Sequence, residues 1–322
     1  MNLPSQTDVL EAYERIRDHV VKTPVIENQQ INDELEARVF FKCENLQHIG
    51  AFKARGAINN ALQLTKEELS KGLLTYSSGN HAQAVAWAAK QLKSKATICM
   101  PTDAPSVKVA GVKRLGATIV FAGTTSDERK AKALEIKEQT KATLIEPFNH
   151  PWTIAGQGTA TLEFLNQLKE KNVELDSLIV PVGGGGLVAG ACLVTKNTGV
   201  RMVGVEPFGC DSMHQSIKEN TPVSVLPAKT VGDGLKPVSV GNINFNVCKE
   251  RIDQTIQVND DEMLAAMVDI LTKANTSVEP SGAAAFAALK KMPRAKGECI
   301  GLLLSGGNVD PLLISEALQR HA

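Results

Sequence analysis

The chain of 322 residues lacks an excess of either charge and a long apolar run. Lys and Arg together number 35, as do Asp and Glu, so the formal net charge is zero. Without a basic excess, we expect no nucleic-acid partner and no anionic membrane surface as partner. The longest apolar runs, such as SLIVPV at 177–182, are far too short to cross a bilayer. The polar N-terminus has no signal-peptide core, so the sequence predicts a soluble, cytoplasmic protein.

Cysteine pairs at metal-binding or redox spacing are also absent. No two cysteines share the C-x-x-C spacing of zinc sites and redox motifs. We therefore expect reduced structural thiols, as is usual in a cytosolic protein. The chain also has no internal repeat and no low-complexity tract. The six cysteines are Cys43, Cys99, Cys192, Cys210, Cys248 and Cys299.

Short β-branched apolar runs alternate along the chain with segments of helical period, which is clearest at 81–92 and 159–170. This alternation predicts an α/β fold of mostly parallel sheets with helices on both faces. A regular βαβαβ series occupies about 72–149, and a second series begins near 150. The predicted strands are 38–44, 73–78, 96–101, 117–122, 142–147, 177–182, 201–207 and 299–305.

A run of four glycines follows the predicted strand 177–182. Consecutive glycines cost conformational entropy, and a tight turn needs only one or two of them. They let the backbone approach a ligand closely and turn its N–H groups toward a phosphate at a helix N-terminus. We therefore interpret this loop as a phosphate site. Its glycines are Gly183, Gly184, Gly185 and Gly186.

The same loop also supports a rival hypothesis. Gly184, Gly186 and Ala189 fit the pattern G-x-G-x-x-A, and Glu206 lies twenty residues beyond Gly186 at the end of the next strand. This is the fingerprint of dinucleotide binding with its ribose-binding acid. Taken alone, it predicts a nicotinamide-dependent dehydrogenase.

Two further loops follow predicted strands, where doubly wound sheets build their sites. SSGNHAQA at 77–84 opens a helix, and its N–H groups and side chains suit a carboxylate or a phosphate. An ordinary N-cap is the alternative interpretation of that loop. Ser305 ends the last strand and precedes two glycines, so its hydroxyl can bind a ligand over the sheet. For Ser305 the alternative is an ordinary turn.

GAFKARGA at 50–57 places Lys53 in small, apolar surroundings. Burial lowers the pKa of a lysine, and a neighbouring cation such as Arg55 would lower it further. A neutral amine can form a Schiff base with a carbonyl group. The alternative is a lysine whose stem lies on apolar surface with its ammonium in water. A Schiff-base lysine, a phosphate loop and a hydroxyl at a strand end are together what a pyridoxal phosphate enzyme needs.

The sequence resembles the fold-type II pyridoxal phosphate enzymes, specifically the branch of serine racemases and serine/threonine dehydratases. The resemblance implies a tryptophan synthase β-like fold of two open, twisted, mostly parallel sheets. It also implies a large cofactor-binding domain made of 1–71 and 150–322, and a small substrate-closing domain at 72–149. The matching stretches include 40–57, 77–84, 104–117, 154–163, 181–190, 203–207, 231–235, 277–284 and 303–310.

Site roles follow from this resemblance. It implies that Lys53 holds the cofactor as a Schiff base, that Phe52 packs beside the cofactor, and that Asn80 binds the pyridoxal phenolic oxygen. The glycines at 183–186 would hold the phosphate, and Ser305 would face the ring nitrogen. The substrate carboxylate would bind the loop containing Ser77, Ser78, Asn80 and His81, and Arg129 would lie in the substrate domain.

The resemblance predicts an ammonia-lyase that converts L-threonine or L-serine to a 2-oxo acid and ammonia. Racemisation needs an acid and a base on opposite faces of Cα. Lys53 would serve one face and Ser78 the other, and serine at position 78 is typical of serine racemases. A racemase is therefore the first alternative. L-threo-3-hydroxyaspartate dehydratase is the second, with Arg129 or His81 as the additional cation.

A divalent cation, Mg²⁺ or Ca²⁺, and a homodimer are further expectations of the family. In the family's metal site, a glutamate, a backbone carbonyl and an aspartate bind the ion. Glu206 and Cys210 match the first two ligands, but Ser212 stands in place of the aspartate, with Asp211 beside it. The sequence therefore predicts weak metal binding at most.

Overall fold

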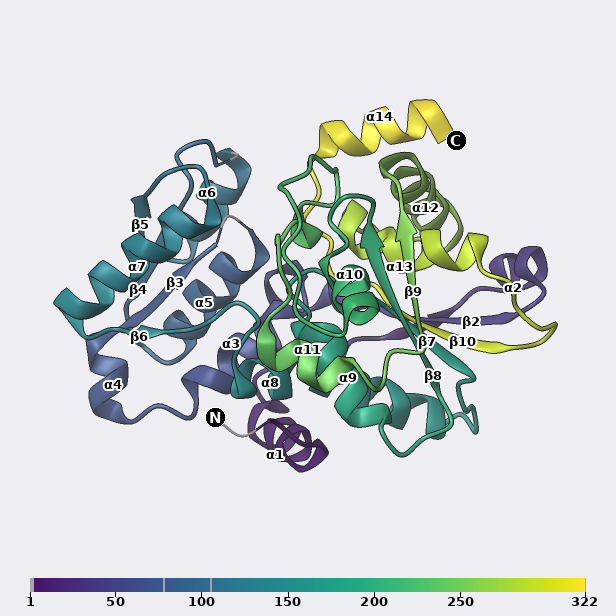
Figure 1. Cartoon of the computed structure of the whole chain (residues 1–322), viewed down its shortest axis with the longest axis horizontal. Coiled ribbons are helices and arrows are strands. Elements are labelled where there is room, and N and C mark those ends of the chain that lie inside the picture. The colour runs from purple at the N-terminus through teal and green to yellow at the C-terminus, as the bar shows by residue number, and fades with distance from the viewer. Residues whose placement is uncertain (1–2, 78, 105, 322) are drawn as a thin grey trace.

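The computed structural model describes residues 3–77, 79–104 and 106–321, which form two sheets wound with helices (Figure 1). The larger sheet has the strand order β1-β2-β10-β7-β8-β9, and the smaller has the order β5-β4-β3-β6. All neighbouring strands are parallel except β1 and β2. The strands are β1 (Val25–Glu27), β2 (Arg38–Lys42), β3 (Leu73–Tyr76), β4 (Ala96–Met100), β5 (Thr118–Phe121), β6 (Thr143–Leu144), β7 (Ser177–Pro181), β8 (Arg201–Pro207), β9 (Gln254–Val258) and β10 (Cys299–Leu303).

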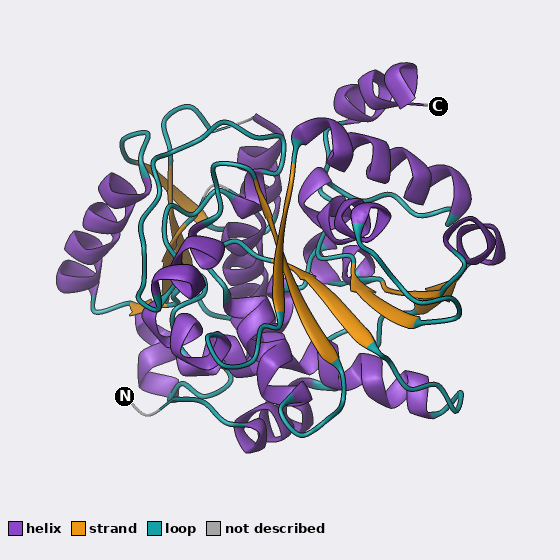
Figure 2. Cartoon of the chain, turned by 45° about the vertical axis from the view of Figure 1, so that its right-hand side comes forward, coloured by secondary structure: helices purple, strands orange, loops and turns teal. Residues whose placement is uncertain are grey.

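Helices pack on both faces of each sheet (Figure 2). The α-helices are α1 (Gln6–Ile16), α2 (Gln29–Leu35), α3 (Lys53–Ala61), α4 (Lys66–Lys71), α5 (Asn80–Gln91), α6 (Ser106–Arg114), α7 (Ser126–Thr140), α8 (Pro151–Lys169), α9 (Gly186–Thr195), α10 (Ser212–Glu219), α11 (Asn242–Cys248), α12 (Asp260–Lys273), α13 (Pro280–Lys291) and α14 (Pro311–His321). Three short 3₁₀ turns are η1 (Glu44–Leu46), η2 (His48–Gly50) and η3 (Asp233–Leu235). One core of the larger sheet lies under α2, α12, α13 and α14, and the other under α1, α8, α9 and α11. The smaller sheet packs against α3, α5 and α6 on one face and α7 on the other.

The predicted α/β class is confirmed, and all eight predicted strands are present. β7 and β8 are buried along almost their whole length, which explains their continuous apolar runs. β6 is much shorter than the predicted 142–147. The prediction missed β1 and β9, which lie at the two edges of the larger sheet. Both are partly exposed, so neither carries the apolar run of a central strand.

Helix α8 packs between the two helices that lead into the site. A Cβ atom on Gly156 of α8 would lie 2.7 Å from the Cα atom of Gly56 in α3. A Cβ atom on Gly190 of α9 would lie 2.5 Å from the backbone nitrogen of Gly158 in α8. These backbones therefore touch, and only glycine allows it. Since α3 begins at Lys53 and α9 begins after the glycine loop, α8 fixes their relative positions.

Residues 72–149 carry all four strands of the smaller sheet. The division of the chain into two domains at these bounds stays a prediction. Across the described part of the chain, no helix combines the length and the apolar character needed to cross a membrane. All six cysteines are free thiols, as predicted.

Candidate active site

The carboxyl ends of β2, β10 and β7 lie side by side at one edge of the larger sheet, because these strands are parallel neighbours. Lys53 follows β2 through η1 and η2, Ser305 lies two residues beyond β10, and the glycine loop follows β7. The backbone joins the first two of these segments, since the Phe52 N–H donates to the Ser305 carbonyl oxygen over 3.1 Å. The fold thus brings three predicted site segments to one place, as expected for a wound sheet.

Lys53 is the first residue of α3, and its amine reaches across to the segment after β6. The Nζ atom donates a hydrogen bond to the carbonyl oxygen of Pro147 over 2.8 Å. It also lies 5.1 Å from the centre of the Phe52 ring. Burial of the ammonium lowers the pKa of Lys53 to about 8. A useful fraction of this amine is therefore neutral near physiological pH.

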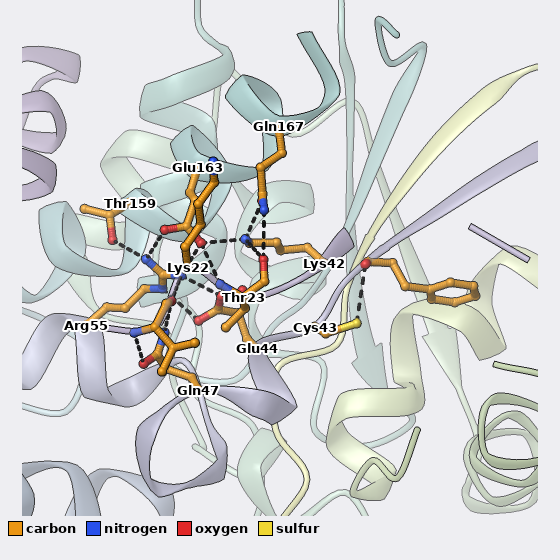
Figure 3. A network of polar contacts seen from close by, with 12 residues as sticks. Lys22, Thr23, Lys42, Cys43, Glu44, Gln47, Arg55, Thr159, Glu163 and Gln167 are labelled. Carbon is orange, nitrogen blue, oxygen red and sulfur yellow. Dashed lines mark hydrogen bonds and ion pairs between the residues drawn. The ribbon is translucent and has the colours of Figure 1, made fainter. Parts of the chain in front are cut away.

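Arg55 contributes nothing to that shift, because its side chain is committed to a buried charge network (Figure 3). The guanidinium binds Glu44 through two hydrogen bonds of 2.8 Å and Glu163 through a third of 2.8 Å. The Nζ of Lys42 donates to Glu163 over 2.6 Å. Burial opposes ionisation of Glu44, but the adjacent Arg55 outweighs it and holds the pKa of Glu44 below its usual value. The network ties the first turn of α3, and hence Lys53, to β2 and α8.

The glycine loop has no room for side chains. A Cβ atom on Gly184 would lie 2.2 Å from the Phe148 ring, and one on Gly183 would lie 2.7 Å from the carbonyl oxygen of Gly234. Gly185 has a φ of +91°, in the region that favours glycine. Asn244 donates to the Gly184 carbonyl oxygen over 2.6 Å and so fixes the turn. The loop therefore presents backbone groups at the N-terminus of α9, as a phosphate site requires.

Ser305 is 4% exposed, and among the described residues its hydroxyl has one weak contact, 3.5 Å from the carbonyl oxygen of Ser281. Its hydrogen-bonding capacity is therefore largely unused by the protein. A buried hydroxyl in this position can serve a ligand atom that lies over the sheet.

The loop after β3 supplies Asn80 and His81, while Ser78 lies outside the described residues. The Asn80 amide donates to Glu279 and accepts from Asn308, each over 2.8 Å. The His81 Nε2 atom lies 3.0 Å from the Ile145 carbonyl oxygen. Burial, with a smaller contribution from Lys53, lowers the pKa of His81 to about 3. His81 is therefore neutral at physiological pH.

Ser77 lies at the start of the same loop and contributes to its shape. Its hydroxyl accepts a hydrogen bond from the Gly79 N–H over 3.3 Å. Its proposed contact with a substrate carboxylate stays a prediction.

Glu279 is a site residue that sequence reasoning missed. It is 4% exposed, and burial raises its pKa to about 7, although Lys108 and the Asn80 hydrogen bond both lower it. The only signal for it in the sequence was its place in the stretch 277–284 shared with the family. Its partner Asn80 lies 199 residues away in the chain, so no local pattern could pair them.

Arg129 makes local contacts at the start of α7. Its guanidinium donates to the Thr124 carbonyl oxygen over 3.1 Å and to the Ser126 hydroxyl over 2.9 Å. Among the described residues, no hydrogen bond joins it to the loop after β3. Its role as a substrate ligand stays a prediction.

The residues at the expected metal position do not form the site that the resemblance implies. Both carboxylate oxygens of Glu206 accept backbone N–H groups, from Met213 and His214, over 2.8 Å each. This carboxyl group thus stabilises the N-terminus of α10, and it does not face a ribose as the dehydrogenase hypothesis requires. The described residues contain no cluster of three or more His, Cys, Asp or Glu that could hold a metal ion.

The neighbouring residues do not complete a metal site either. The Asp211 carboxylate accepts from Gln215 and Gln257 over 3.0 and 3.1 Å, so it is occupied elsewhere. Ser212 contributes a buried hydroxyl without a partner among the described residues, and a hydroxyl is a weaker ligand than a carboxylate. Only one carboxylate remains for the ion, and its oxygens are already used.

Pyridoxal phosphate, in contrast, fits the residues present. Lys53 offers a buried amine of lowered pKa, the loop 183–186 offers a backbone cradle, and Ser305 offers a buried hydroxyl with spare capacity. These are the partners of an aldehyde, a phosphate and a ring nitrogen.

Known proteins resemble this chain over almost its whole length. The family described as "Pyridoxal-phosphate dependent enzyme" matches residues 16–306. The serine racemase of Schizosaccharomyces pombe is 40% identical, with 96% of this chain and 95% of the relative covered. The L-threo-3-hydroxyaspartate ammonia-lyase of Saccharomyces cerevisiae is also 40% identical, with the same coverage. The crystal structure of a threonine deaminase from T.th. superimposes with a TM-score of 0.91 at 38% identity, covering 95% of this chain and 99% of that one.

Proposed function

Because the chain belongs to the pyridoxal-phosphate dependent enzymes, we propose that it is an ammonia-lyase that converts L-serine or L-threonine to a 2-oxo acid and ammonia. Racemisation of serine is a second activity within this proposal. The observation that supports it best is the convergence of Lys53, the glycine loop and Ser305 at one sheet edge. The names of the three relatives contain serine, threonine and hydroxyaspartate, all of which carry a β-hydroxyl group.

When bound, pyridoxal phosphate supplies an aldehyde that reacts with amines and a ring that withdraws electrons. The amine of Lys53 would hold the cofactor between turnovers and, once released, take the Cα proton of the substrate. The backbone N–H groups of residues 183–186 would hold the phosphate. Ser305 would offer the ring nitrogen a neutral hydroxyl, a weaker partner than a carboxylate, which favours loss of the β-hydroxyl group over transamination.

The two cations that the sequence offers for a second substrate carboxylate, His81 and Arg129, give hydroxyaspartate little support, although the Lys108 ammonium lies beside the loop after β3. A second substrate carboxylate needs a second cation. His81 is neutral at physiological pH, and Arg129 is engaged at the start of its own helix. Of these two candidates only Arg129 is charged, and among the described residues no hydrogen bond joins it to this loop. Hydroxyaspartate remains the substrate of an alternative dehydratase.

A serine racemase is the principal alternative. It requires a proton donor on the face of Cα opposite Lys53, and Ser78 is the candidate from the sequence.

The test is a product assay on the purified holoenzyme with L-serine, L-threonine and L-threo-3-hydroxyaspartate. The 2-oxo acid and D-serine are followed together in the wild-type protein, in Ser78→Ala and in Lys53→Ala. We expect 2-oxo acid from serine and threonine, and no product from Lys53→Ala. D-serine that disappears in Ser78→Ala while elimination from L-serine survives would make the protein a two-base racemase. If the wild-type holoenzyme forms neither product from serine or threonine, the proposal is wrong.

A small amino acid as substrate, a homodimer and a cytoplasmic location belong to the same proposal. The two-domain division into 1–71 with 150–322, and 72–149, does too. The division is supported by the two separate sheets, and the location by six free cysteines. Sedimentation of the holoenzyme would decide between monomer and dimer.

A further inference from the structure

One ion pair connects the two sheets above the site. Lys108 lies in α6, beside the smaller sheet, and its ammonium contacts the Asp233 carboxylate in η3 of the larger part. The two side chains are 20% and 36% exposed. Every other ion pair between described residues lies entirely within 72–149 or entirely outside it. Among the described residues, this is therefore the one ion pair that crosses the boundary.

The Lys108 ammonium also faces the loop that follows β3. Its Nζ atom would lie 3.7 Å from a Cβ atom on Gly79, the residue that precedes α5. Its charge lowers the pKa of Glu279, which in turn accepts a hydrogen bond from Asn80. A single side chain therefore lies beside Gly79 and influences the pKa of the carboxyl group that binds Asn80.

The backbone next to Asp233 is fixed by hydrogen bonding and packing. The backbone of the next residue, Gly234, is fixed in place, because its N–H donates to the Ser281 hydroxyl over 3.0 Å at the start of α13. The Gly234 carbonyl oxygen also lies against Gly183 of the glycine loop. The Ser281 carbonyl oxygen is the one weak partner of Ser305. Asp233 is thus anchored beside the residues that would hold the cofactor.

We propose that Lys108 is a positioning residue whose ion pair with Asp233 holds Gly79 and the start of α5 against the cofactor-binding part and thereby sets substrate affinity. This inference rests on the proposed function, and it extends it by naming the contact that closes the substrate loop. Lys108 acts through the loop and through Asp233, and it takes no part in proton transfer. Loss of the pair weakens binding of the amino acid and leaves the chemical step nearly unchanged.

A double-mutant cycle on the holoenzyme tests the pair. Lys108→Met, Asp233→Asn and the double variant are compared for binding of glycine, an amino acid without a β-leaving group. The dissociation constant is read from the change in visible absorbance of the bound cofactor. We expect each single variant to bind glycine about tenfold more weakly, and the double variant to be no weaker than Lys108→Met alone. The kcat for L-serine should change by less than about threefold.

Two further variants separate the effect of the Lys108 charge from general effects of substitution in α6. Lys108→Arg keeps the charge and should restore glycine affinity to within about threefold of the wild type. Lys113→Met removes an exposed lysine of the same helix and should leave the affinity unchanged. Retention of cofactor absorbance shows that each variant is folded.

Three results would overturn the inference. The first is a double variant whose fold-loss in glycine affinity equals the product of the fold-losses of the two single variants, since the residues would then act independently. The second is a loss in Lys108→Met without a loss in Asp233→Asn, which would make Lys108 a direct substrate ligand. The third is unchanged glycine binding in both single variants. Glycine binding needs no turnover, so a wild-type protein that binds glycine but yields no product from serine would refute the proposed function alone.

Discussion

The lowered pKa of Lys53 makes a prediction that pH can test directly. Raising the pH removes a proton from Nζ, and only the neutral amine attacks an aldehyde or an acylating reagent. With a pKa of about 8, the neutral fraction rises about tenfold between pH 7 and pH 9 and then levels off. A lysine with the ordinary pKa of 10.5 would gain about a hundredfold over the same interval and would not level off. The two cases therefore differ by about a factor of ten in one experiment.

The assay uses the cofactor-free protein, in which the Lys53 amine is free. A brief pulse of an amine-acylating reagent at each pH is followed by peptide mass spectrometry, which reports the labelled fraction of Lys53. Exposed Lys66 in the same sample corrects for the efficiency of the reagent. The rate at which added pyridoxal phosphate develops its visible absorbance provides an independent profile, and it should level off at the same pH.

A hundredfold rise in Lys53 labelling between pH 7 and pH 9, without a plateau, would refute the reasoning. Burial would then not lower the pKa, and the Pro147 carbonyl oxygen would be stabilising an ordinary ammonium. If Lys53 labelling levels off but the rate of cofactor binding does not, the pH dependence of cofactor binding is set by a group other than Lys53.

Three other changes have distinct expected results. Gly184→Ala should abolish retention of the cofactor, because the added methyl group has no space beside Phe148. Gly199→Ala is the control, since a Cβ atom there meets nothing within 4 Å, and this variant should retain the cofactor. Equal retention of the cofactor by the two variants after dialysis would contradict the proposed phosphate site. Arg55→Met removes the guanidinium that binds the buried carboxylates of Glu44 and Glu163. It should lower the free energy of unfolding by about 3–5 kcal/mol in urea titrations. Arg17→Met, at an exposed ion pair, should cost less than about 1 kcal/mol, and similar losses in the two variants would contradict the role of burial. Removal of divalent cations with a chelator should leave the wild-type activity unchanged. The Ser212→Asp variant adds a carboxylate, so its activity or unfolding temperature should respond to Mg²⁺. A loss of wild-type activity on chelation that Mg²⁺ restores would show that a metal site exists.

Much of the fold could be predicted because parallel strands buried on both faces carry a distinctive pattern. The runs at 177–182 and 201–207 are apolar for that reason, and both are strands. Strand β9, QTIQV, is partly exposed at the sheet edge and lacks such a run, so it was missed. The shortness of β6 has a related cause, since only two of its residues pair with β3.

The site was predictable where its residues follow strands, and not where their partners are distant in sequence. The glycine loop and Ser305 follow strands directly, Lys53 begins α3 two short turns after β2, and the structure brings the three together. The direction of Arg55 could not be predicted, because Glu163 is 108 residues away and belongs to another helix. Glu279 and the packing role of the glycines in α8 could not be predicted for the same reason, since their partners are distant in sequence.

If the proposed site roles hold, the two sheets contribute different parts of the reaction. The segments that follow strands of the larger sheet would supply the lysine, the phosphate loop and the partner of the ring nitrogen, which every reaction of the cofactor needs. Asn80 and Lys108, from helices beside the smaller sheet, reach the larger part through Glu279 and Asp233. A change confined to that loop can therefore alter the substrate or the fate of the Cα proton without disturbing cofactor binding. Relatives with one fold can on this view differ between racemase and ammonia-lyase, and position 78 is where we expect this chain's own balance to be decided.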